Sequence, residues 1–190
     1  VMALQPHDEA AVILREKADE VGARLVAEGI DYGVTARDVA VGGQQISVKG
    51  LAAEYPDLFL PLHGPHQAQN AATAVAAVEA FLGGGEQALD LDVLREGLAA
   101  VDSPGRLEIV RRSPTVIVDA AHNPHGALAL REALQDSFNF AKIVGVVAIL
   151  ADKDATEMLA ILEPACADVV VTRTASAPAM PPARLPTRAT

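Results

Sequence analysis

The sequence has 190 residues, a formal net charge of −10, 51% hydrophobic residues and only 3% aromatic residues. This length suits one ordinary domain or two small ones, and the apolar content excludes a chain that is disordered throughout. The acidic balance and the scarcity of aromatics argue against nucleic-acid and anionic-membrane partners. A single cysteine, Cys166, excludes an internal disulfide and a cysteine-based zinc site, and we expect it to be a small core residue before a strand.

The sequence contains no apolar run of about 20 residues, and its start lacks the pattern of a signal peptide. We therefore expect a soluble, cytoplasmic protein with no membrane partner.

Hydrophobic spacing in the first half predicts helices and a hairpin. Apolar residues recur four, three and four positions apart in an expected helix over 8–29, with Gly29 as its stop. Alternating residues around Gly42-Gly43 predict a hairpin within 31–49, and a short strand is expected over 57–62. An Ala-rich helix over 66–82 and a helix over 91–101, starting near Asp90 or Asp92, complete this half.

A turn cluster at 102–105 is the expected hinge, and after it short apolar runs alternate with helical patterns. This order predicts an α/β fold with a parallel or mostly parallel sheet. Residues 173–190 hold four prolines and no acid, so we expect a disordered tail. The expected strands are 107–111, 115–119 (buried), 143–150 and 168–172, and the expected helices are 124–138 and 154–162.

Polar residues open the Ala-rich helix, in the run His66-Gln67-Ala68-Gln69-Asn70. The Asn70 amide both donates and accepts, which suits the edge of a nucleobase, and a helix N-terminus carries partial positive charge. Judged by itself, such a run is more often ordinary helix capping than a ligand site.

The run Ser103-Pro104-Gly105-Arg106 predicts a tight turn that directs a guanidinium group, which suits phosphate. An ordinary surface arginine at the start of a strand is the commoner case.

The most informative run is 116–126, where an apolar strand ends in Asp119, a small-residue loop carries His122, and Asn123-Pro124 begins a helix. Ligands of α/β sheets lie at the carboxyl ends of strands, so Asp119 is placed to accept hydrogen bonds from ribose hydroxyls and His122 faces the same crevice. The alternative is that Asp119 caps the loop and His122 is solvated.

Neither pair of histidines, His63 with His66 or His122 with His125, has further ligands nearby, so no metal site is expected from them. The sequence also lacks the G-x-x-x-x-G-K-[ST] run that holds nucleotide phosphates and the G-x-G-x-x-G run of dinucleotide sites.

Taken together, three runs resemble the folylpolyglutamate synthase/dihydrofolate synthase branch of the Mur ligase superfamily. They are 62–71, Pro104-Gly105-Arg106-Leu107-Glu108 and Asp119-Ala120-Ala121-His122-Asn123-Pro124-His125. The likeness runs from about Gln5 to about Thr172. It implies that 1–101 is the end of a central ATPase domain and that 102–190 is part of a Rossmann-like C-terminal domain.

The resemblance implies an ATP- and Mg²⁺-dependent ligase that joins L-glutamate to dihydropteroate or folate through an acyl phosphate. By position, Asn70, Arg106 and Asp119 bind ATP, and His122 lies near the nucleotide or the glutamate. The Mg²⁺ ligands and the phosphate loop match no residues of this chain. We therefore expect the chain alone to be inactive and the full-length protein to be a monomer. The alternatives are a non-catalytic nucleotide-binding module and a Mur-type ligase with another acceptor.

Overall fold

The computed structural model describes residues 1–172, and the tail expected over 173–190 lies outside the described residues. The chain divides into two compact units, Val1–Asp102 and a second that begins at Ser103. Each unit has its own hydrophobic core. Within residues 1–172, no helix combines the length and the apolar character needed to cross a bilayer.

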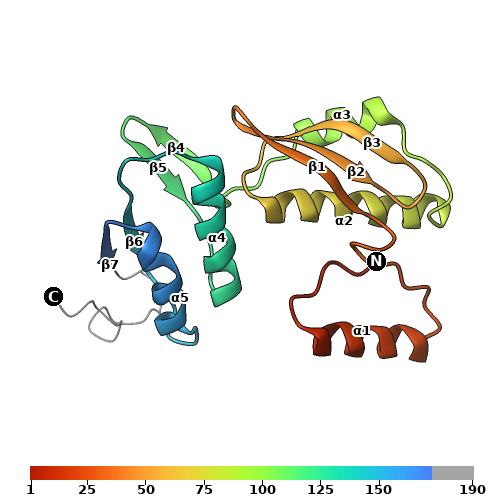
Figure 1. Ribbon diagram of the computed structural model, residues 1–190, viewed down its shortest axis with the longest axis horizontal. Helices are drawn as coiled ribbons and strands as arrows, with labels where there is room; N and C mark the ends of the chain where they lie inside the picture. Colours follow the sequence, from red (N-terminus) through yellow and green to blue (C-terminus); the bar gives the residue numbers. More distant parts are fainter. Residues whose placement is uncertain (173–190) are drawn as a thin grey trace. The chain divides into compact units, whose positions relative to one another are not determined.

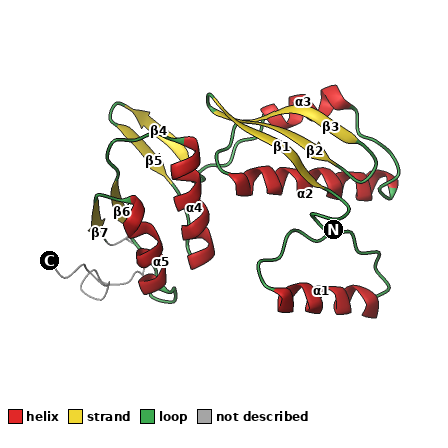
Figure 2. Ribbon diagram, viewed as in Figure 1, coloured by secondary structure: helices red, strands yellow, loops and turns green. Residues whose placement is uncertain are grey.

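The first unit combines an antiparallel sheet, with β2 in the centre, and helix α2 along one face of it (Figures 1 and 2). The expected hairpin is confirmed, because Gly42 takes a positive φ of 81° in the turn between its two strands. The elements are α1 (Asp8–Glu20), β1 (Gly33–Ala40), β2 (Gly43–Lys49), β3 (Glu54–Leu60), α2 (Pro65–Gly83) and α3 (Leu91–Ala99).

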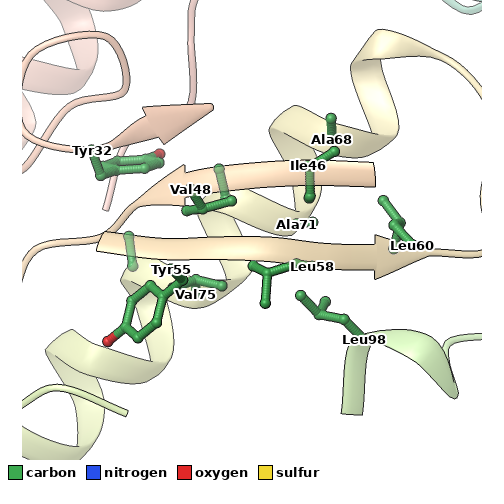
Figure 3. Close-up of a cluster of buried hydrophobic side chains, with 12 residues drawn as sticks. Tyr32, Ile46, Val48, Tyr55, Leu58, Leu60, Ala68, Ala71, Val75 and Leu98 are labelled. Atoms are coloured by element: carbon green, nitrogen blue, oxygen red, sulfur yellow. The ribbon is translucent and has the colours of Figure 1, made fainter. Parts of the chain in front are cut away.

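The core of this unit lies between the sheet and α2 (Figure 3). Alternate residues of β2, including Ile46 and Val48, point into it, as the period of a half-buried strand requires. Ala68 and Ala72 of α2 are fully buried, and their small side chains let the helix approach the sheet closely. The approach of α2 fixes where the first two turns of this helix, which include the candidate site residue Asn70, lie on the sheet.

Helix α1 is shorter than its spacing predicts, and the expectation of a stop at Gly29 is wrong. Gly22 takes a left-handed φ of 66° just after the helix, and the Ala23 amide bonds back to Ala18 O at 2.8 Å. Extended residues follow, with Met2 bridged to Ala27. Of the two residues that carried the apolar spacing past Glu20, Val21 is 62% exposed and Leu25 is half-buried in the extended segment.

Two other boundaries shift for local reasons. Strand β3 begins at Glu54 rather than at 57, and it tolerates Pro56 because β3 is an edge strand of the sheet. Helix α3 begins after Asp90, whose carboxylate accepts from the amides of Asp92 and Val93. Of the two residues expected near the start of this helix, Asp90 and Asp92, the cap is therefore Asp90.

The second unit has the expected order of elements but not one parallel sheet among its described residues. Strands β4 and β5 pair antiparallel, and β6 and β7 pair parallel in a separate two-stranded sheet. The elements are β4 (Glu108–Arg112), β5 (Thr115–Val118), α4 (Pro124–Ser137), β6 (Val144–Val147), α5 (Ala155–Leu162), a 3-10 turn (Glu163–Ala165) and β7 (Asp168–Val171).

A cavity of about 240 Å³ is lined by residues of both β5 and β6, among them Ile117 and Val146. The two strands belong to separate two-stranded sheets and form no hydrogen-bonded ladder with each other. Strand β5, which pairs with β4 alone, is largely exposed, contrary to the expectation of a buried strand. Cys166 lines the same cavity, half-buried just before β7, and burial raises the pKa of its thiol.

Candidate functional site

A tight turn presents Arg106 at the start of the second unit. The Arg106 amide donates to Ser103 O at 3.1 Å, and Gly105 takes a φ of 73° at the third position, the pattern of a type II turn with proline at the second. The Glu108 carboxylate accepts from the Gly105 amide at 2.8 Å. The turn is therefore held from within, and the Arg106 side chain is exposed to solvent.

Asp119 fastens this turn to the end of strand β5. One carboxylate oxygen accepts from the Leu107 amide at 3.0 Å and the other from the Ala121 amide at 2.8 Å. A backbone bond from Ala120 to Gly105 O, at 2.8 Å, reinforces the link. The structure thus brings together the arginine and the aspartate that the sequence singled out 13 positions apart.

Leu107 stands beside Arg106 in a conformation that only this anchoring explains. Its φ is 46°, a left-handed value that costs a residue with a side chain about 1–2 kcal/mol. Its side chain is 3% exposed, so burial and the bond to Asp119 together hold it there. The backbone just after Arg106 is therefore held in one conformation by Asp119.

His122 and the N-terminus of α4 complete this cluster. His122 is exposed, and its Nδ1 lies 3.1 Å from Ala120 O. Asn123 caps the helix by accepting from the Gly126 amide at 2.7 Å, and Pro124 takes the first helical position, as the sequence predicted. A helix N-terminus favours negative charge, so the cluster suits an anionic ligand.

Asn70 lies in the other unit, exposed in the second turn of α2. Its amide donates to Gln67 Oε1 at 3.2 Å, so the two side chains form one polar edge. Gly64 precedes the helix with a φ of 94°, and Pro65 begins it. His63 is half-buried just before this entry, and burial lowers the pKa of its imidazole.

The sequence interpretation missed two residues that shape these surfaces. Glu108 could have been found, because a glutamate three residues after a Pro-Gly turn can reach back to the Gly105 amide. Gln44 had no such signal: it lies 20 residues before Gly64, yet its side chain bonds to Gly64 O. Within residues 1–172, no three His, Cys, Asp or Glu side chains gather closely enough to hold a metal ion.

Comparison with known proteins connects these residues to a family. Residues 105–189 match the model of the Mur ligase glutamate ligase domain. Over 165 residues, 86% of this chain, the sequence is 49% identical to dihydrofolate synthase/folylpolyglutamate synthase of Mycobacterium tuberculosis. The chain belongs to the folylpolyglutamate synthase/dihydrofolate synthase family of Mur ligases. The resemblance inferred from the three sequence runs is thereby confirmed.

Solved structures of this family share the fold. A folylpolyglutamate synthase of Mycobacterium tuberculosis complexed with ADP superposes with a TM-score of 0.89 at 47% identity, covering 94% of this chain and 39% of that chain. A folylpolyglutamate synthase complex with AMPPCP and folate gives 0.78 at 31% identity, covering 90% and 41%. The α/β fold of a Mur-ligase-type protein is therefore confirmed. The chain spans about a third of the length of the curated relatives it matches.

Proposed function

We propose that this chain supplies part of the nucleotide site of an ATP-dependent ligase that adds L-glutamate to dihydropteroate, to folate polyglutamate, or to both. In this proposal, 1–101 is the end of the central ATPase domain and 102–190 is part of the glutamate ligase domain. The γ-phosphoryl group of ATP moves to a substrate carboxylate oxygen, which gives an acyl phosphate and ADP. The glutamate amine then attacks the acyl carbon, phosphate leaves, the amine loses a proton, and an amide remains.

The observation that carries the proposal is the anchored turn that holds Arg106 beside Asp119. A guanidinium has five N–H donors in a rigid fork, which suits phosphate oxygens. Each Asp119 oxygen accepts one backbone amide, and a carboxylate has about four acceptor sites, so it keeps capacity for a ribose hydroxyl. Asn70 is proposed to contact the base, and His122 the nucleotide or the incoming glutamate.

Mg²⁺ is proposed for the full-length protein, because a divalent cation neutralises the charge that develops as phosphoryl groups transfer. Among the described residues, no three His, Cys, Asp or Glu side chains gather closely enough to form a metal site by themselves. The proposal assigns the ion to residues outside this chain and gives it no role in holding Arg106 or Asp119.

Calorimetric titration of this chain with ADP tests the proposal. We expect Arg106→Ala to weaken ADP binding at least tenfold, because a hydrogen bond to a charged group contributes about 1.5–3 kcal/mol and tenfold is about 1.4 kcal/mol. Arg106→Lys should recover part of the affinity, since lysine keeps the charge but not the fork. Arg111→Ala, at another exposed arginine of the same unit, is the matched control.

Unchanged affinity in Arg106→Ala would overturn the role of the arginine. Failure of the unaltered chain to bind ADP at millimolar concentration would overturn the nucleotide site. The acceptor is tested separately, by screening the full-length protein with dihydropteroate, tetrahydrofolate and muramyl precursors. Turnover of a muramyl precursor alone would assign the protein to a different Mur-type ligase.

A further inference from the structure

Gln44 is a fully buried polar residue on the central strand of the first unit. Its side chain is 1% exposed, and it lies on β2 between Val39 of β1 and Leu60 of β3. A buried amide without partners costs free energy comparable to a lost hydrogen bond, so each of its polar atoms needs an accounted partner.

The amide of Gln44 uses both donors and its acceptor. Its nitrogen donates to Leu62 O at 2.9 Å and to Gly64 O at 3.0 Å. Its oxygen accepts from Arg37 Nε at 2.5 Å. A flipped amide would face two carbonyl oxygens with its own oxygen, so this network allows one orientation only.

These bonds hold the segment through which the chain enters α2. Gly64 is the cap residue of the helix, and its carbonyl also accepts from the Gln67 amide at 3.1 Å. Asn70 lies one turn further along the helix and bonds back to Gln67 of the first turn. A shift of Gly64 therefore moves the polar edge formed by Gln67 and Asn70.

The rest of α2 does not depend on Gln44. Ala72 and Val75 pack into the sheet core, and Glu79 near the C-terminal end is bonded to the loop between β2 and β3. Loss of the Gln44 bonds should therefore loosen the entry of the helix and leave its middle in place.

We propose that Gln44 is a positioning residue for nucleotide binding: it holds the Leu62 and Gly64 carbonyls, and through them sets where Asn70 meets the base of an adenine nucleotide. The inference rests on the proposed function, because the nucleotide is the ligand assigned to Asn70. Gln44 itself touches no ligand in this role.

The test compares Gln44→Met, which keeps the length of the side chain but removes its hydrogen bonds, with Gln45→Met. Gln45 is the next residue of β2, and its side chain lies on the opposite face of the strand. Amide hydrogen exchange is followed along α2, and ADP affinity is titrated at a temperature where circular dichroism shows every variant folded. If Gln44→Met does not fold, Gln44→Glu replaces it, because it keeps an acceptor for Arg37 but loses both donors.

We expect the amides of 67–70 to exchange at least tenfold faster in Gln44→Met, with 75–79 unchanged, and ADP to bind three- to tenfold more weakly. In an Asn70→Ala background, Gln44→Met should weaken ADP binding no further, because the two residues act through one contact. Gln45→Met should leave both measurements unchanged.

Uniform acceleration of exchange along α2, unchanged ADP affinity in Gln44→Met, or full additivity with Asn70→Ala would each overturn the positioning role. If the unaltered chain fails to bind ADP, the proposed function falls. In that case exchange alone decides whether Gln44 holds the helix entry: local acceleration supports this and uniform acceleration overturns it.

Discussion

At the scale of single residues, Asp119 shows how one carboxylate can fasten a turn to the end of a strand. Its carboxylate bonds to the amides of Leu107 and Ala121, and so stabilises a left-handed residue next to the arginine. The sequence pointed to Asp119 for ribose recognition, and the alternative was a carboxylate that caps its loop. The structure places it in the capping role, with acceptor capacity left for the proposed ribose contact.

His63, at the entry to α2, predicts a pH dependence of stability. Burial lowers the pKa of its imidazole below the ordinary value of about 6.5, so between those two pKa values the unfolded state binds more protons than the folded state. Stability then rises with pH in that window. We expect the urea midpoint of the first unit to fall as the pH is lowered from 7.5 through 6.5 towards the folded-state pKa.

The measurement is a series of urea titrations at several pH values, and the comparison is between variants. His63→Gln should flatten the dependence, whereas the same change at His7, which is exposed, should not. Equal slopes for His63→Gln and the unaltered chain would contradict the prediction.

At the scale of elements, α2 is held by polar contacts near both ends and by apolar packing between them. Glu79 is 0% exposed, and its carboxylate accepts from the amides of Leu51 and Ala52 and from Tyr55 Oη, the last at 2.6 Å. Tyr55 in turn accepts from the Leu89 amide, and burial, followed by the bond to Glu79, raises the pKa of its phenol. This junction ties the helix to the loop between β2 and β3 and to the segment that leads into α3.

Removal of the Glu79 carboxylate should therefore destabilise the first unit. In Glu79→Ala, three donors lose their acceptor, and each buried unpaired group costs about 1–3 kcal/mol, so we expect a loss of about 3 kcal/mol or more in the free energy of unfolding. Val78→Ala, at the neighbouring half-exposed position, should cost less than about 1 kcal/mol. Urea denaturation measures both, and a similar small loss in the two variants would refute the role of Glu79.

At the scale of the whole molecule, the two units have separate cores, and the proposed nucleotide contacts come from both. Asn70 belongs to the first unit, whereas Arg106, Asp119 and His122 belong to the second. A ligase of this family also needs groups that hold the transferred phosphoryl and neutralise its charge. The chain has no G-x-x-x-x-G-K-[ST] run to do this.

We therefore expect this 190-residue chain to bind nucleotide without catalysing ligation. Incubation with ATP, Mg²⁺, L-glutamate and dihydropteroate should give no ADP above a blank without protein. A full-length dihydrofolate synthase/folylpolyglutamate synthase in the same assay is the positive control. Glutamate-dependent turnover by the chain alone would show that the groups it contains suffice.

The sequence by itself determined the order of the helices and strands, most of their bounds except the end of α1, the Asn123 cap, the turn before Arg106 and the family. These features depend on local spacing, turn chemistry and short motifs, all of which can be recognised from residues that are close together in the sequence. Only the tertiary structure decided that β5 and β6 stand apart, that Asp119 holds Leu107, and that Gln44 and Glu79 are buried. These depend on hydrogen bonds and packing between residues 12 to 28 positions apart or more, and no local period encodes which distant partner a buried polar group will meet.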